Sequence, residues 1–244
     1  MLLQSENILI TGVSSGLGKF LYENVPGALG LTRENKKQTL RTLEGKEDLV
    51  IVHCAFNAAR DPSRAYESLN DNIFLTRDLV RLPHKKFVYI SSVGVYETVP
   101  TDYGLTKRHA ESIVQAESTN YLILRCSALL GPTIRQNSFL KIMEQDNCTL
   151  SLSGQSVFNY ILQNDILEVL EDEESVNLSG TYDFVSAQST TLQEVADKYK
   201  KDPIFGEFVY YTRFGEDRTI KNLHPHKNRT SLETIEFFLK EHNE

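Results

Sequence analysis

Short runs of consecutive apolar residues recur along the first half of the chain, and segments with apolar residues at helical spacing lie between them. The apolar runs are residues 7–11, 28–32, 49–56 and 87–90. Strands that are buried on both faces of a parallel sheet have this continuously apolar pattern. Strands that alternate with helices in this way predict an α/β fold built on a doubly wound parallel sheet.

The segments between the runs are predicted to be helical. Residues 35–48 and residues 63–82 have helical spacing, and the second of these helices carries Asn72. After the strand at residues 87–90 the chain turns and resumes helical spacing at Tyr103. Strand, turn and helix therefore follow one another in each part of the predicted sheet.

A glycine-rich turn follows the first strand directly and opens a helix. In such a context Gly12 permits a tight turn, Gly16 lets the backbone approach a pyrophosphate, and Gly18 lets the helix pack against the strand. The amide groups at the helix start would then hold the phosphates. This predicts a Rossmann-type dinucleotide-binding fold. The residues of this turn that we expect at the cofactor are Gly12, Ser14, Ser15, Gly16, Leu17 and Gly18.

The end of the second strand bears on the choice of cofactor. Thr32 and Arg33 stand where an acidic residue would bind the ribose hydroxyls of NAD, whereas an arginine accommodates the 2′-phosphate of NADP. NADP is therefore favoured over NAD, although Arg33 could also simply face solvent. We expect Ala55, Phe56 and Cys126 to contact the same cofactor.

Tyr103 and Lys107 lie four residues apart, so their side chains share one helix face. A neighbouring ammonium favours a phenolate, so we expect the pKa of Tyr103 to fall below its usual value of about 10. Such a tyrosine exchanges protons with a substrate. Ser92, at the end of the preceding strand, would hydrogen-bond the same substrate oxygen. The alternative is that this spacing is an ordinary amphipathic helix turn.

Several segments together resemble the short-chain dehydrogenase/reductase superfamily, and its extended branch in particular. That branch includes nucleotide-sugar epimerases, dehydratases and dTDP-4-dehydrorhamnose reductases. The resemblance covers nearly the whole chain in order. The segments that carry it are TGVSSGLG, Asn72 in NIFLT, ISS ending at Ser92, YGLTK with Glu111, and residues 122–132, 159–170, 180–199 and 228–241.

The resemblance implies a catalytic set and a division of the chain. Tyr103 would be the general acid or base, Lys107 would lower its pKa and bind the nicotinamide ribose, Ser92 would hold the reacting oxygen, and Asn72 would anchor a water. Residues 1–130 would form the dinucleotide-binding core. Residues 131–244 would form mainly a small C-terminal substrate-binding lobe, with the segment around 159–170 returning to the core. In that lobe Asn137 and Ser138 would contact a nucleotide-sugar substrate. A homodimer is also implied.

Three departures from the branch bear on the substrate. The glycine spacing TGxxxGxG is that of the short-subunit branch, and Ser92 and Tyr103 lie only 11 positions apart, so the loop between them is short. Residues 156–158 contain no arginine where the branch has one that holds the substrate pyrophosphate. Arg135, Arg213 and Arg229 are candidates to replace it.

The motifs favour a reductase of a keto-sugar nucleotide. Dehydration is disfavoured because Val93 follows the paired serines, with no adjacent Asp-Glu pair. An epimerase of the same fold stays open, since it uses the same tyrosine. A protein that binds NADP(H) as a sensor, without turnover, is the alternative from another class.

Composition narrows the remaining classes. The 244 residues suit one large domain or a domain with a small lobe, and the net charge of −7 disfavours a nucleic-acid partner. No apolar window approaches a membrane span and the start of the chain lacks a secretory pattern, so we expect a cytoplasmic protein without a membrane partner. The three cysteines lack metal-site spacing, and no metal is expected.

Overall fold

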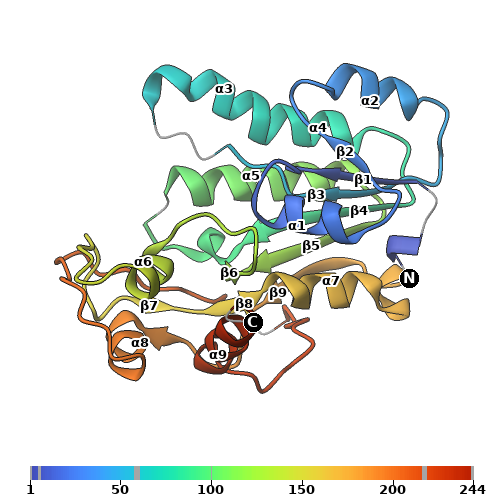
Figure 1. Ribbon diagram of the computed structural model, residues 1–244. Coiled ribbons are helices and arrows are strands. Elements are labelled where there is room, and N and C mark those ends of the chain that lie inside the picture. Colours follow the sequence, from blue (N-terminus) through green and yellow to red (C-terminus); the bar gives the residue numbers. More distant parts are fainter. Residues whose placement is uncertain (1, 5–6, 58–60, 100, 216–218, 243–244) are drawn as a thin grey trace.

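Six parallel strands form the central sheet of the protein, seen here in a computed structural model (Figure 1). The structure describes residues 2–4, 7–57, 61–99, 101–215 and 219–242. The strand order is β2-β1-β3-β4-β5-β9. The strands are β1 (Ile8–Thr11), β2 (Leu29–Leu31), β3 (Val50–His53), β4 (Lys86–Ser92), β5 (Tyr121–Cys126) and β9 (Gly180–Phe184).

Side chains of each central strand serve two cores, one on either face of the sheet. On β1, Ile8 and Ile10 belong to one hydrophobic cluster and Leu9 to the other. On β4, Ile90 lies in the first cluster and Tyr89 in the second. Successive side chains of a strand point to opposite faces. A continuously apolar strand is therefore what a sheet covered on both faces requires.

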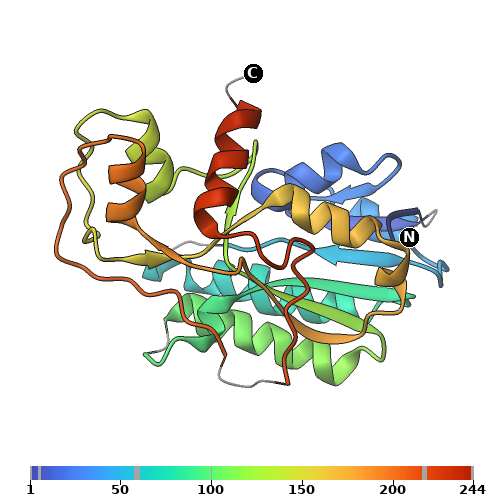
Figure 2. The same cartoon turned by 90° about the horizontal axis from the view of Figure 1, so that it is seen from below.

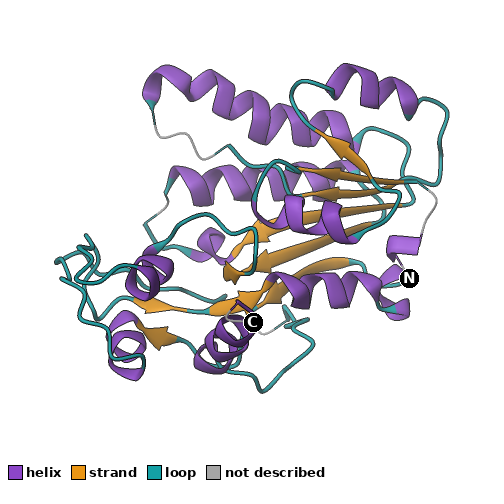
Figure 3. Cartoon of the chain, in the orientation of Figure 1, coloured by secondary structure: helices purple, strands orange, loops and turns teal. Residues whose placement is uncertain are grey.

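Helices cover both faces of this sheet (Figure 3). Apolar residues of α1 and α7 join the first cluster, and those of α4 and α5 join the second. Within the described residues no helix is both long and apolar enough to cross a bilayer. These layers have α1 (Gly16–Asn24), α2 (Lys36–Thr42), α3 (Ala65–Leu69), α4 (Leu75–Val80), α5 (Asp102–Glu117) and α7 (Gln163–Glu171), with short turns η1 (Leu2–Gln4), η2 (Pro62–Arg64), η3 (Asn70–Phe74), η4 (Val93–Tyr96) and η5 (Glu173–Val176).

A smaller lobe lies beside the sheet (Figure 2). Its core gathers Leu130, Phe139, Tyr160, Ile235 and Phe238. Two short strand pairs run through it, β6 with β8 in parallel and β7 with β10 antiparallel. The elements of the lobe are α6 (Ser138–Glu144), α8 (Leu192–Lys198), α9 (Ser231–His242), β6 (Ala128–Leu130), β7 (Val157–Phe158), β8 (Tyr160–Leu162) and β10 (Thr190–Thr191).

The predicted Rossmann-type sheet is confirmed, with differences in detail. Helix α2 ends at Thr42 and strand β3 at His53, short of the predicted ends at residues 48 and 56. The helix expected over residues 63–82 is interrupted by a π-helical turn, η3, so that α3 and α4 are separate elements. Strand β9 pairs with β5 and extends the central sheet, which we did not expect of residues 180–184. The late part of the chain thus returns to the sheet at β9 as well as packing on it through α7.

Candidate functional site

A cavity of about 770 Å³ lies along the carboxyl ends of the central strands. Its volume falls in the range of ligand sites, and it spans the point between β1 and β3 where the strand order reverses, which is where such sheets bind ligands. Every residue that the sequence predicts at the cofactor lines it. These residues are Gly12, Ser14, Ser15, Gly16, Leu17, Gly18, Thr32, Arg33, Ala55, Phe56, Tyr103, Lys107 and Cys126.

The glycine-rich turn has the shape that a dinucleotide requires. A Cβ on Gly18 would lie 2.5 Å from the carbonyl oxygens of Thr11 and Gly12, so only glycine lets α1 pack this close to β1. Gly16 adopts a φ of +61° and a Cβ there would meet open space. The side of Gly16 on which a Cβ would lie is thus open, while its amide and carbonyl bond to Thr133. The open side leaves room for a phosphate, and the residues present fit a dinucleotide.

An ion pair occupies the cavity wall next to the end of β2. Arg33 donates to Asp71 at 2.5 Å, and the side-chain Nδ2 of Asn57 donates to the same carboxylate at 2.8 Å. Lys36 pairs with Asp78 at 3.4 Å. Arg33 is 63% exposed, whereas Asp71 is 17% exposed. Asp71 therefore holds the arginine in place at the rim of the cavity. The sequence did not suggest this partner, which comes from the helix after β3.

Ser92, Tyr103 and Lys107 meet at the other end of the cavity. Ser92 ends β4, and the other two lie on α5. The side chains of Ser92 and Tyr103 both lie next to Gly94, whose amide donates to the Ser92 hydroxyl at 3.1 Å. The Tyr103 ring packs edge-on against Phe56, with the ring centroids 4.8 Å apart. The structure thus brings together three of the four residues predicted to be catalytic.

The prediction that Lys107 lowers the pKa of Tyr103 is wrong for this structure. Tyr103 is 41% exposed where it lines the cavity, yet desolvation by the surrounding protein raises its pKa, and Ser92 lowers it by less. Lys107 donates instead to the Ile90 carbonyl at 2.7 Å, and its ammonium lies over the Phe56 and Tyr89 rings. Burial lowers the pKa of Lys107 to about 8. Tyr103 and Lys107 do share one helix face, but the Lys107 ammonium points toward β4. Its low-dielectric surroundings determine its pKa.

Asn72, the fourth predicted catalytic residue, faces the loop after β3. It is buried in the π-helical turn, its Oδ1 accepts from the Asn57 amide at 2.7 Å, and its Nδ2 donates to the Asn57 carbonyl at 3.0 Å. It is not among the described residues that line the cavity. Its side chain thereby fixes the loop that supplies Asn57 to Asp71. The water-anchoring role of Asn72 stays a prediction.

On the side of the small lobe, Asn137 lines the cavity and Ser138 is not among the described lining residues. The Asn137 side chain accepts a hydrogen bond from the Leu140 amide at 2.9 Å and so caps α6. Of the three arginines considered for the substrate, Arg213 is exposed and Arg135 lines the cavity.

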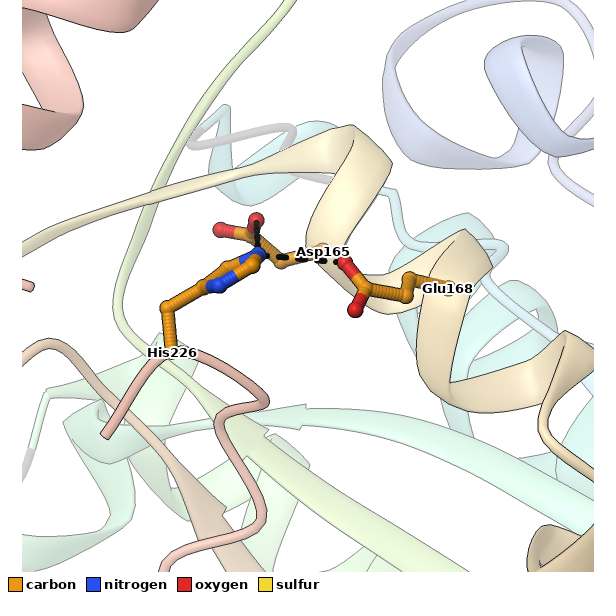
Figure 4. A group of neighbouring side chains, drawn as sticks. All are labelled: Asp165, Glu168 and His226. Atoms are coloured by element: carbon orange, nitrogen blue, oxygen red, sulfur yellow. Dashed lines mark hydrogen bonds and ion pairs between the residues drawn. The ribbon is translucent and has the colours of Figure 1, made fainter.

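Arg229, the third of these arginines, pairs with Asp165, which meets Glu168 of α7 and His226 in a cluster of charged residues (Figure 4). The His226 ring lies 3.8 Å from Asp165 and 3.1 Å from Glu168. Asp165 also pairs with Arg229 and with His224. The three side chains drawn have ligand atoms within 4.8 Å of one another, but Arg229 already neutralises the buried carboxylate. We interpret the cluster as an anchor for the segment around residues 224–229.

A second charge network, behind the serines, was not suggested by the sequence. Glu111 accepts from Ser91 at 2.5 Å and from two nitrogens of Arg125, the shorter contact being 2.6 Å. Arg125 also donates to the Tyr96 hydroxyl at 2.8 Å, and Tyr96 donates to Asp183 at 2.7 Å. The network joins β4, η4, α5, β5 and β9. It holds the strand ends in place beneath the cavity.

The parallel sheet, the glycine-rich turn at its switch point and the cavity define a Rossmann-type protein. More narrowly, the chain belongs to the NAD dependent epimerase/dehydratase family, because the model of that family matches residues 8–169. This confirms the resemblance to the extended branch of the short-chain dehydrogenases/reductases. A search of curated proteins finds no match.

Solved structures with the same fold cover nearly the whole chain. A dTDP-4-dehydrorhamnose reductase from Bacillus anthracis, in complex with NADP, is 17% identical with a TM-score of 0.73, over 98% of this chain and 100% of that chain. A UDP-N-acetylglucosamine 4-epimerase from Bacillus cereus is 19% identical with a TM-score of 0.69, over 98% of both chains. MoeE5, in complex with UDP-glucose and NAD, is 15% identical with a TM-score of 0.71, over 98% of this chain and 100% of that chain. At these identities the likeness concerns the fold.

Proposed function

We propose that this protein is an NAD(P)-dependent oxidoreductase that reduces a carbonyl group of a nucleotide-sugar-like substrate. The observation that carries the proposal is that Ser92 and Tyr103 lie side by side, next to Gly94, in the lining of a cavity that begins at the glycine-rich turn. A phosphate-binding turn at one end and a proton donor at the other suit a dinucleotide whose reactive ring reaches Tyr103. Membership of the family supports a nicotinamide cofactor.

In this proposal Tyr103 is the general acid. Burial raises its pKa, so the phenol is protonated at neutral pH and ready to donate its proton to a carbonyl oxygen. Ser92 would hydrogen-bond the same oxygen and orient it. Lys107, with a pKa of about 8, is mainly charged at neutral pH and lines the same cavity, where it would bind the nicotinamide ribose. The nicotinamide supplies the hydride when it is bound.

We further propose NADP as the preferred cofactor. Arg33 lines the cavity beside the end of β2, where a 2′-phosphate would lie. A guanidinium carries five donors, so the bond to Asp71 leaves others for a phosphate. The pairing also fixes the orientation of the arginine in advance, which reduces the entropy lost on binding.

The experiment that tests the proposal follows the absorbance of NADPH during incubation with a panel of keto-sugar nucleotides. We expect oxidation that Tyr103→Phe reduces by at least about a hundredfold, since loss of general acid catalysis has that size. Tyr66→Phe is the matched control, because Tyr66 is 74% exposed on α3 and should leave the rate unchanged. Tight NADPH binding with no turnover on any substrate would instead refute the oxidoreductase proposal and support an NADP(H)-binding sensor.

An epimerase is the second candidate, since the family includes such enzymes and they use the same tyrosine. The two activities differ in what happens to the cofactor. A reductase consumes one NADPH for each product molecule, whereas an epimerase interconverts two sugar nucleotides with no net change in the cofactor. Product analysis by chromatography, with cofactor absorbance followed in the same sample, separates them.

A further inference from the structure

Four basic side chains line the cavity in the described part of the chain, and three of them have partners near its two ends. Arg33 and Lys36 pair with acids near the end of β2, and the Lys107 ammonium is held by the Ile90 carbonyl beneath Tyr103. The fourth is Arg135, which comes from the small lobe. Among the described residues it forms no salt bridge, so its charge is not already neutralised.

Arg135 reaches across the cavity to the glycine-rich turn. Its Nε and Nη2 both donate to the Ser15 hydroxyl, at 3.2 Å and 2.8 Å. Ser15 directly precedes α1 and lies beside Gly16, where a Cβ would meet open space. The guanidinium therefore lies next to the surface on which the phosphates of a dinucleotide would rest.

The backbone around Arg135 is fastened to the same turn. The Gly16 amide donates to the Thr133 carbonyl at 2.9 Å, and the Thr133 hydroxyl donates to the Gly16 carbonyl at 2.8 Å. These two bonds set the position of the segment that carries Arg135. They also engage the Gly16 amide, so that it is not free to donate to a phosphate in this arrangement. A positive side chain next to the turn offsets that loss.

We propose that Arg135 binds the pyrophosphate of the dinucleotide cofactor, and that the small lobe thereby supplies part of the cofactor site. The inference rests on the proposed function for the existence of that cofactor. It assigns Arg135 to the cofactor and not to the diphosphate of the substrate, which was its expected use. A guanidinium suits the task because its parallel N–H groups match phosphate oxygens.

The test measures binding directly, by calorimetry on the full chain, with NADPH, ADP-ribose and adenosine 2′-phosphate. Arg135→Gln should raise the dissociation constants of NADPH and ADP-ribose roughly 10- to 100-fold, the effect of losing hydrogen bonds from a charged group. Adenosine 2′-phosphate, which has no pyrophosphate, should bind with unchanged affinity. Arg135→Lys should retain part of the affinity. The exposed Arg213→Gln is the matched control and should bind all three ligands normally.

Two results would overturn the inference alone: Arg135→Gln binds NADPH and ADP-ribose as the unchanged protein does, or it raises only the KM for a sugar nucleotide. Failure of the unchanged protein to bind NADPH or ADP-ribose would instead refute the proposed function. Thermal unfolding of the ligand-free variants separates a binding defect from a folding defect. If Arg135→Gln unfolds early, the Arg135→Lys protein decides. Weaker binding of ADP-ribose with unchanged binding of adenosine 2′-phosphate supports the inference. Unchanged affinity for ADP-ribose, or an equal loss for both ligands, overturns it.

Discussion

The pair of Glu111 and Arg125 should contribute strongly to stability, because it is buried. Glu111 is 3% exposed and Arg125 is 14% exposed, and the guanidinium binds the carboxylate through two nitrogens. Removing Glu111 leaves the Arg125 guanidinium, which is only slightly exposed, without its carboxylate. The Ser91 hydroxyl would also lose its acceptor. We therefore expect Glu111→Ala to lower the free energy of unfolding by about 3–5 kcal/mol.

Helix α5 offers a matched control on its own surface. Glu117 pairs with Arg81 through two hydrogen bonds of 2.7 Å and 2.6 Å, as short as those of the buried pair, but the side chains are 31% and 56% exposed. Exposed pairs of this kind contribute about 0–1 kcal/mol, because water screens them. Glu117→Ala removes the same chemical group from the same helix. The difference between the two variants isolates burial.

Equilibrium urea unfolding, followed by far-UV circular dichroism, measures both variants. The double variant Glu111→Ala, Arg125→Ala should lose less free energy than the sum of the single variants, by about 0.5–3 kcal/mol, since the second substitution removes the unpaired charge. Equal losses for Glu111→Ala and Glu117→Ala would refute the reasoning. So would strict additivity in the double variant.

Three further predictions concern the sheet and the cofactor site. Burial lowers the pKa of His53 to about 3 from 6.5. The free energy of unfolding should therefore fall by up to about 1.4 kcal/mol per pH unit as the pH drops from 6.5 to 3. Urea unfolding of His53→Gln should lack this slope. Gly18→Ala should lower the Tm more than Gly16→Ala, because a Cβ on Gly18 would meet carbonyl oxygens at 2.5 Å. Gly16→Ala should cost only the roughly 1–2 kcal/mol of a left-handed φ. The reverse order of Tm values would contradict the packing of Gly18. Arg33→Ala should weaken NADPH roughly 10-fold and NADH little by calorimetry, and equal effects would remove the case for NADP.

The strands were predictable because their burial on two faces demands a continuous apolar run. The Leu9 side chain serves one core and Ile10 the other, so β1 is apolar from Ile8 to Ile10. Strand β9 lacks that signal, since it lies at the edge of the sheet and its first three residues are only partly buried. Its pairing with β5 is set by tertiary packing, which a local pattern does not contain.

The candidate site was predictable where spacing along one element decides the geometry. The turn from Gly12 to Gly18 and the helix face shared by Tyr103 and Lys107 are of this kind. Contacts across the fold, such as that between Arg135 and Ser15, could not be predicted, because no local pattern relates two such distant positions. The pKa of Tyr103 also depends on what surrounds it. Desolvation by the surrounding protein raises that pKa, and the spacing of residues along a helix does not predict desolvation.

The short link between Ser92 and Tyr103 works because two glycines let its ends pack together. A Cβ on Gly104 would lie 2.5 Å from the Gly94 carbonyl, and a Cβ on Gly94 would lie 3.2 Å from the Tyr103 ring. The Thr101 hydroxyl caps α5 by accepting from the Gly104 amide at 3.1 Å. A longer loop is thus not needed to align the serine with the tyrosine. The segment after Gly131 also contributes Ile134, Arg135 and Asn137 to the lining of the same cavity.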